Sequence, residues 1–217
     1  MVIDMYYHPM SSPCRAVMLT AEALGINFNY KIVDLLAGEK LTPEINPQET
    51  IPFMVDDDYS LSESRAIMCY LADQYGNQNT KLYPKSIRAR ALVHQRMHFD
   101  ASTLYTAISN YYYPVVFRGQ TEYVEANYEK MKDAFGILEK FLEDQATDFC
   151  AGSDLTIADL ALIATVSTAE AFGFELDEYK KVAEWADKVK SSAPGYGNAC
   201  DEGLEILKGL MAETSVE

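Results

Sequence analysis

The chain has 217 residues and a formal net charge of −15, with 33 acidic against 18 basic residues. This charge argues against binding to nucleic acid or to an anionic membrane surface, because phosphate groups are neutralised by Lys and Arg. No apolar run reaches the roughly 18 residues of a membrane span, and the N-terminus lacks the pattern of a signal peptide. We therefore expect a cytoplasmic globular protein of one or two domains.

The first 75 residues alternate between strand-like and helix-like pieces. We expect strands at "VIDMYY" and "FNYKIVDL", and two more in "IPFMVDDDYSLS" around an Asp-rich turn. A helix is expected at "PCRAVMLTAEALG", with Pro13 in its first turn and Gly25 at its end, and another at "SRAIMCYLADQYG". A short helix is expected between the second and third strands. This order predicts a small α/β sheet domain with helices packed on it.

The chain changes character near residue 80. The polar stretch 77–86 is expected to be a linker, and everything beyond it is expected to be helical. Apolar residues step by three or four along three helices, at Val93, Met97, Ala101, Leu104 and Ile108, at Val124, Tyr128, Met131, Phe135, Leu138 and Leu142, and at Tyr179, Val182, Trp185 and Val189. The segment "LTIADLALIATV" is apolar nearly all round, so it is expected to be the central buried helix, with Thr156 and Asp159 as its capping box. We predict an N-terminal domain over 1–76 and an all-helical domain over 87–217.

The cysteines and histidines show no spacing typical of a metal site or a disulfide framework. The cysteines are expected to be reduced thiols, and they are Cys14, Cys69, Cys150 and Cys200. The histidines are expected at the surface or in an interface, and they are His8, His94 and His98. We predict no metal.

Two serines lie where the first strand ends and the first helix begins. Backbone N–H groups are unpaired at such a corner, and the helix dipole is positive there. We expect Ser12, next to Pro13, to cap the helix, which leaves Ser11 to point its hydroxyl into a cleft. A serine nucleophile would need a base, and no triad pattern accompanies Ser11.

Two further signals follow in the chain. The Ile51–Pro52 bond opens a strand, where proline is unusual, and a cis bond there would present the backbone of Ile51 to an extended peptide. Glu63, Ser64 and Arg65 lie at a helix N-terminus, which suits an anion or a carboxylate. The alternatives are an ordinary trans proline and plain capping by serine.

Taken together and in this order, these motifs resemble one family over nearly the whole chain. "YYHPMSSPCRAVMLTAEALG", "INPQETIPFMVDD", "LSESRAI", "FDASTLYTAISNYYYPVVF", "LTIADLALIATVST" and "SSAPGY" are similar to the corresponding segments of cytosolic glutathione transferases of the insect-type delta class. The resemblance implies a thioredoxin-like N-terminal domain, an all-α C-terminal domain, a homodimer and glutathione as co-substrate.

The resemblance also implies roles for single residues. Ser11 matches the serine whose hydroxyl activates the glutathione sulfur. Ile51, beside Pro52, matches the residue that pairs with the cysteinyl unit, and Glu63, Ser64 and Arg65 match the site of the γ-glutamyl group. The pocket for an apolar electrophile is expected to include a helical set next to Pro114, which would break or kink the helix; this acceptor set is Tyr105, Ile108, Tyr113, Val116 and Phe117.

The chain departs from the family pattern at the glycine end of glutathione. Glu49 and Lys40 stand where the family usually has histidines, and the nearby connection is a few residues shorter. Two function classes therefore remain open: a glutathione transferase that conjugates apolar electrophiles or reduces peroxides, and a non-catalytic ligand-binding or carrier protein on the same scaffold. Retention of Ser11 and the Glu63–Arg65 motif favours the first, whereas loss of the histidines favours the second.

Overall fold

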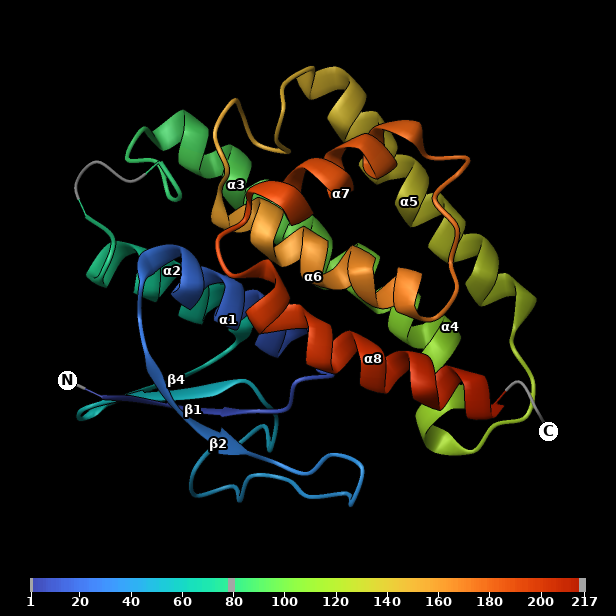
Figure 1. The fold of residues 1–217 in the computed structure, drawn as a ribbon, viewed down its shortest axis with the longest axis horizontal. Coiled ribbons are helices and arrows are strands. Elements are labelled where there is room, and N and C mark those ends of the chain that lie inside the picture. Colours follow the sequence, from blue (N-terminus) through green and yellow to red (C-terminus); the bar gives the residue numbers. More distant parts are fainter. Residues whose placement is uncertain (1, 78–80, 215–217) are drawn as a thin grey trace.

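A computed structural model describes residues 2–77 and 81–214 and shows a sheet domain joined to a larger bundle of helices (Figure 1). The elements of the sheet domain are β1 (Ile3–Tyr7), α1 (Ser12–Leu24), β2 (Phe28–Ile32), β3 (Phe53–Asp56), β4 (Tyr59–Ser62) and α2 (Ser64–Gln74). The strand order is β2-β1-β3-β4, with β1 parallel to β2 and antiparallel to β3. The predicted thioredoxin-like α/β arrangement is confirmed.

The remaining elements are helical, as the apolar periodicity predicts. They are α3 (Ile87–Phe99), the π-helical turn η1 (Asp100–Leu104), α4 (Tyr105–Arg118), α5 (Glu125–Gln145), α6 (Ile157–Ala171), α7 (Lys180–Ser192) and α8 (Tyr196–Thr214). None of the helices in the described ranges 2–77 and 81–214 is both long and apolar enough to cross a membrane. The predicted linker 77–86 includes residues 78–80, which lie outside the described residues, so the predicted domain boundaries remain a prediction.

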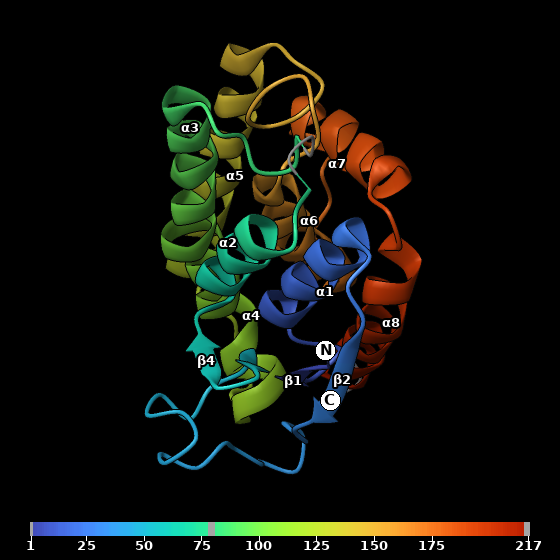
Figure 2. The same cartoon turned by 90° about the vertical axis from the view of Figure 1, so that its left-hand side faces the viewer.

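One face of the sheet is covered by α1 and α2, which lie between the strands and the other helices (Figure 2). Ile3 and Met5 of β1 point to this face and are buried, as the alternation of a half-covered strand requires. The segment between β2 and β3 loops away beneath the sheet (Figure 2). That segment contains turns and no helix, so the short helix predicted there is wrong.

Helix α6 is the centre of the helical bundle. All but one of its residues are buried, which agrees with the all-round apolar pattern, and it packs against α1, α3, α7 and α8. The predicted capping box is confirmed: the Asp159 carboxylate accepts from the Thr156 backbone N–H at 2.9 Å, and both side chains of the box make their reciprocal contacts. The first turn of this buried helix is therefore capped by side chains of its own segment.

Helix α8 closes over the corner between β1 and α1. At Gly203 an added Cβ would lie 1.9 Å from the carbonyl oxygen of Pro9. This backbone approach requires glycine, because any side chain would push the loop before Ser11 away from the bundle.

The apolar stripe predicted along 93–108 is wrong at one position. Ala101 is exposed, and Asp100 occupies the buried face instead. The π-helical turn η1 is the physical reason, since a π turn holds more residues than an α turn and rotates the following positions around the axis. A carboxylate is thereby placed in the core of the bundle.

Candidate glutathione and electrophile site

Ser11 is the N-cap residue of α1. Its carbonyl oxygen accepts from the N–H of Arg15 at 3.0 Å, and its side-chain oxygen accepts from the N–H of Cys14 at 3.4 Å. Ser11 is partly buried at the end of the loop that follows β1. Because the hydroxyl oxygen accepts from the helix, its own proton remains to donate to a ligand outside the helix.

The prediction that Ser12 caps α1 is therefore wrong. Ser12 is the first residue within the helix, and its side chain turns into the core. Within the described ranges the Ser12 hydroxyl is buried without a hydrogen-bond partner. Cys14 is fully buried, and burial raises the pKa of its thiol to about 11, so it is a protonated core residue.

His8 also differs from its prediction. It is buried, not at the surface, and its Nδ1 accepts from the Met10 N–H at 3.3 Å. His94 is partly buried and contacts the Tyr83 hydroxyl at 2.6 Å, whereas His98 is exposed as expected. Within 2–77 and 81–214 no cluster of three or more His, Cys, Asp or Glu residues is arranged to hold a metal ion.

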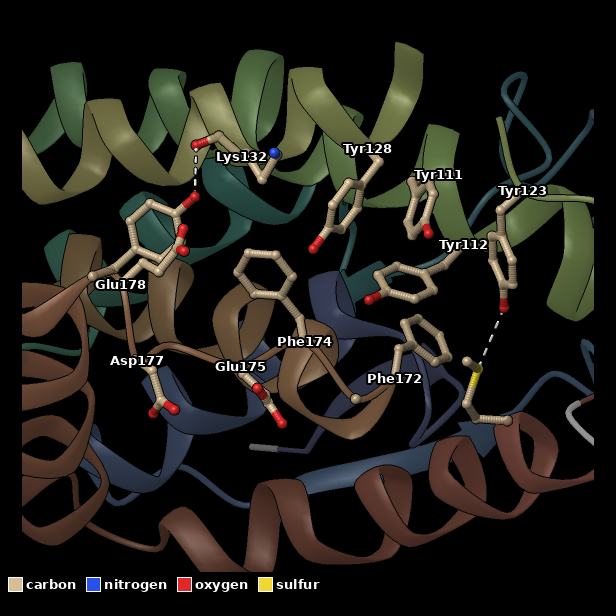
Figure 3. A pocket seen from close by; sticks show the side chains of 13 residues that line it. Tyr111, Tyr112, Tyr123, Tyr128, Lys132, Phe172, Phe174, Glu175, Asp177 and Glu178 are labelled. Carbon is tan, nitrogen blue, oxygen red and sulfur yellow. Dashed lines mark hydrogen bonds between the residues drawn. The ribbon is translucent and has the colours of Figure 1, made fainter. Parts of the chain in front are cut away.

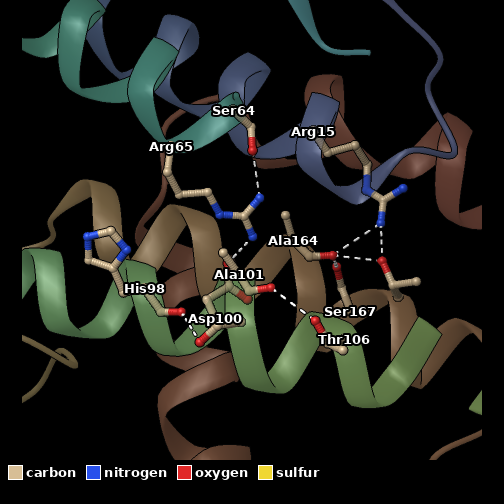
Figure 4. Close-up of polar contacts among 11 residues, drawn as sticks. Arg15, Ser64, Arg65, His98, Asp100, Ala101, Thr106, Ala164 and Ser167 are labelled. Atoms are coloured by element: carbon tan, nitrogen blue, oxygen red, sulfur yellow. Dashed lines mark hydrogen bonds and ion pairs between the residues drawn. The ribbon is translucent and has the colours of Figure 1, made fainter. Parts of the chain in front are cut away.

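A buried arginine ties the Ser11 corner to the helical bundle. The Arg15 guanidinium donates to the carbonyl oxygens of Pro9 at 3.0 Å and Met10 at 2.8 Å. On α6 it donates to the Thr168 hydroxyl and, at 3.2 Å, to the carbonyl oxygen of Ala164 (Figure 4). None of the ion pairs among the described residues involves Arg15. Burial lowers its pKa. The loop that ends at Ser11 is thus held by a buried cation that donates to four neutral oxygens, while its Nε has no partner among the described residues.

The second part of the predicted site is the Ile51–Pro52 bond, which is cis. It lies directly before β3, the strand that pairs with β1. Pro52 is buried and Ile51 is partly buried. Ile51 and Ser11 therefore come from segments joined to adjacent strands of the sheet.

The third part is the start of α2. Glu63 has a positive φ of 67° at the N-cap position, makes no side-chain cap and is exposed, so capping by serine does not explain this motif. The Ser64 hydroxyl is buried and accepts from Arg65 Nη1 at 2.6 Å. As at Ser11, a hydroxyl that accepts from the protein keeps its proton for a ligand.

Arg65 does not extend freely into solvent. Its guanidinium forms an ion pair with the fully buried Asp100 of η1, and it links α2 to the helical bundle (Figure 4). Burial raises the pKa of Asp100, and the charge of Arg65 opposes this effect. Sequence reasoning missed Asp100; the available signal was a carboxylate at a spacing of three from Met97 and four from Leu104 on an apolar stripe.

Glu49 and Lys40 lie on the loop beneath the sheet. Lys40 Nζ is 3.7 Å from Glu49 Oε2, and both side chains are substantially exposed, at 69% and 41%. The residue before Glu49, Gln48, donates through its side chain to Glu63 Oε1 at 2.9 Å. This loop is therefore connected to the start of α2.

The predicted acceptor set lies on α4. The ring centroid of Tyr113 is 6.2 Å from that of Tyr105 and 5.1 Å from that of Phe117. Ile108 is buried beside them, Val116 is partly buried, and Phe117 is 36% exposed. Burial raises the pKa of Tyr113, and the charge of Arg15 opposes this effect. Helix α4 continues past Pro114 to Arg118, so Pro114 does not break it.

Two family models match the chain. The model of the glutathione S-transferase N-terminal domain matches residues 5–79, and that of the C-terminal domain matches residues 106–194. Together they match more than half of the chain.

Solved structures agree with these matches. A delta-class glutathione transferase of Nilaparvata lugens is 46% identical, with a TM-score of 0.91 over 98% of this chain and 99% of that one. A glutathione transferase of Bombyx mori is 38% identical, with a TM-score of 0.90 over 97% and 98%. A glutathione transferase homologue of Drosophila mojavensis, solved with bound glutathione, is 31% identical, with a TM-score of 0.88 over 98% and 97%. The chain belongs to the glutathione transferase family, and its similarity to a delta-class enzyme agrees with the class that its motifs indicate.

Proposed function

We propose that this glutathione transferase conjugates the glutathione thiolate to apolar electrophiles in detoxification, with Ser11 as its catalytic residue. The observation that supports this most is the Ser11 hydroxyl, whose oxygen accepts from the Cys14 N–H and whose proton remains to donate. The thiolate is the reactive form of a thiol, whose ordinary pKa is about 8.5. Lowering that pKa by about two units takes about 2.7 kcal/mol. One charge-assisted hydrogen bond is worth about 1.5–3 kcal/mol and a helix N-terminus up to about 2 kcal/mol, so the two together suffice.

The remaining glutathione contacts are proposed from the family motifs that the chain retains. The backbone of Ile51, beside cis Pro52, pairs with the cysteinyl unit, while Glu63 receives the γ-glutamyl ammonium and Ser64 donates to its carboxylate. Arg65 acts through Ser64, because its guanidinium is committed to Asp100. The relative from Drosophila mojavensis, solved with bound glutathione, supports glutathione as the co-substrate.

The acceptor set on α4 takes the electrophile. Its aromatic and aliphatic side chains favour apolar substrates, and Tyr113 and Phe117 offer the partly exposed surface. Reduction of peroxides is a second reaction open to the same thiolate. The carrier alternative is less supported, because the hydroxyl donors at Ser11 and Ser64 are retained. We further propose a cytoplasmic homodimer, as is typical of the family.

Replacing Arg65 by lysine is expected to weaken glutathione binding about two- to tenfold, since one hydrogen bond of about 0.5–1.5 kcal/mol to Ser64 is lost. Lysine retains a positive charge for Asp100, so the protein still folds. The KM for glutathione is measured at fixed electrophile concentration. If KM is unchanged while the melting temperature falls, Arg65 is only a structural link between α2 and η1.

Replacing Lys40 by methionine is expected to weaken glutathione binding about fivefold, because Glu49 then faces the glycine carboxylate unpaired. Two such charges about 4 Å apart repel by about 1 kcal/mol in water, which is the appropriate limit for this exposed pair. The further change Glu49→Gln is expected to restore the affinity. Titration calorimetry at two salt concentrations measures the glutathione affinity of both variants. If neither variant differs from the parent by more than about twofold, this pair lies outside the glutathione site.

The proposed function is tested by binding to immobilised glutathione and by the ultraviolet difference absorbance of bound glutathione thiolate. A thiolate band that forms below pH 8, together with conjugation of an aryl halide, is expected. A protein that neither retains glutathione nor produces the band would be a carrier.

A further inference from the structure

A second cavity lies apart from the acceptor set. It has a volume of about 660 Å³, is partly open to solvent, and is lined by residues of α4, α5, the segment between α6 and α7, and the end of α8 (Figure 3). Its lining includes none of the predicted glutathione or acceptor residues. Phe172 separates the two regions: it is 1% exposed, stacks on Tyr112 of the cavity at 4.8 Å, and lies 6.3 Å from Tyr113 of the acceptor set.

The walls of this cavity are aromatic. The Tyr111 ring lies 4.8 Å from Tyr123 and 5.2 Å from Tyr128 between centroids, and the Phe174 ring lies 6.5 Å from Tyr128 (Figure 3). Burial raises the pKa of Tyr111 and Tyr123, so these phenols are neutral at physiological pH. The cavity therefore presents neutral aromatic faces.

The rim of the cavity is acidic. Glu175, Asp177 and Glu178 are exposed there. Among the described residues that line the cavity, Lys132 is the single basic one; it is paired with Glu129 at 2.7 Å, and its Nζ lies 5.1 Å from the centroid of the Tyr128 ring. A cation thus already uses one of these aromatic faces, and the net charge of the rim remains negative.

We propose that this cavity binds an organic cation with an aromatic or apolar body, independently of glutathione. Aromatic faces attract cations within about 6 Å of the ring centroid, and the attraction increases as water is excluded. The acidic rim and the net charge of −15 raise the local concentration of cations. The volume lies within the roughly 300–1,000 Å³ of small-molecule sites.

Tetraphenylphosphonium and tetraphenylborate form a suitable pair of probes, because they share size and shape and differ in the sign of their charge. Equilibrium dialysis is expected to show the phosphonium binding at least tenfold more tightly than the borate. The affinity is expected to fall with salt and to be the same with and without saturating glutathione. Equal binding of both probes, or competition with glutathione, would overturn the proposal.

Variants of the lining residues test whether the phosphonium binds in this cavity. Tyr128→Leu keeps apolar bulk but removes the aromatic face, and it is expected to weaken phosphonium binding about 3- to 30-fold. The triple variant Glu175→Gln, Asp177→Asn, Glu178→Gln is expected to reduce the preference for the cation. A matched control that removes three exposed acids of the sheet domain, Glu44→Gln, Asp57→Asn, Asp58→Asn, is expected to change it less than twofold.

Two results would contradict this assignment. If both triple variants lose the preference for the cation equally, the cation is attracted by the net charge of the protein alone. If Phe117→Ala weakens phosphonium binding as much as Tyr128→Leu does, the cation binds in the acceptor pocket. Circular dichroism melts of each variant check folding, and Tyr111→Leu serves as a second aromatic test if Tyr128→Leu fails to fold.

Discussion

Ser11→Ala is expected to lower kcat/KM for conjugation by about ten- to a thousandfold. The variant loses a hydroxyl donor worth about 1.5–4 kcal/mol to the thiolate and to the transition state. It also loses the cap of α1, so the free energy of unfolding is expected to fall by about 0.5–2 kcal/mol. Both losses come from the Ser11 hydroxyl. Its oxygen accepts from the Cys14 N–H and carries the proton that is donated to the thiolate.

The pH dependence of thiolate absorbance separates the two effects. In the parent the thiolate band of bound glutathione is expected to form below pH 8. In Ser11→Ala the apparent pKa of the glutathione thiol is expected to rise by about one to two units, since each unit corresponds to about 1.4 kcal/mol. Ser12→Ala is the matched control. Its buried hydroxyl has no partner within the described ranges, so its removal is expected to leave rate and stability nearly unchanged. A larger rate loss in Ser12→Ala than in Ser11→Ala would overturn the assignment.

Asp159→Ala is expected to cause a large loss of stability with little change in the chemistry of the folded molecules. The Asp159 carboxylate is fully buried. It accepts from the Thr156 N–H and hydroxyl at 2.9 and 2.8 Å, from the Cys150 N–H at 2.8 Å and from Trp185 Nε1 at 2.9 Å. Each buried donor left without an acceptor costs about 1–3 kcal/mol, so a total loss above about 3 kcal/mol is expected.

A calorimetric melt measures this loss. For a chain of this length 1 kcal/mol corresponds to about 2–4 °C, so the melting temperature is expected to fall by at least about 6 °C. The matched control is Asp154→Ala, which removes an exposed carboxylate paired with Lys81 and is expected to change stability by less than about 1 kcal/mol. Normal stability with lost activity in Asp159→Ala would instead assign Asp159 to the active site.

The candidate site could be predicted where its chemistry is local in the chain. The hydroxyl at Ser11 and the Glu63–Arg65 motif are visible as short segments at helix starts. The partner of Arg65 was not visible, because Asp100 lies 35 residues later and turns inward only through the π turn. Arg65, which was expected to contact glutathione directly, is therefore hydrogen-bonded to Ser64 and paired with Asp100.

The sequence by itself determined where the helices and strands form, except for the short helix expected between β2 and β3, and it determined that α6 is the buried centre and that Thr156 and Asp159 cap it. These features depend on side chains within one or two turns of each other, where spacing alone decides which groups meet. It also identified the family, because the motifs occur in order along nearly the whole chain.

Only the tertiary structure decided which groups share a buried charge or a cavity. It paired Arg65 with Asp100, gave Asp159 a third partner in Trp185, and left Arg15 among neutral oxygens. It also placed Tyr111 and Tyr128 on one cavity with the acidic rim of the segment between α6 and α7. Such contacts depend on how helices pack, and packing sets burial; burial in turn decides whether a charge needs a partner and whether an aromatic face is open to a ligand.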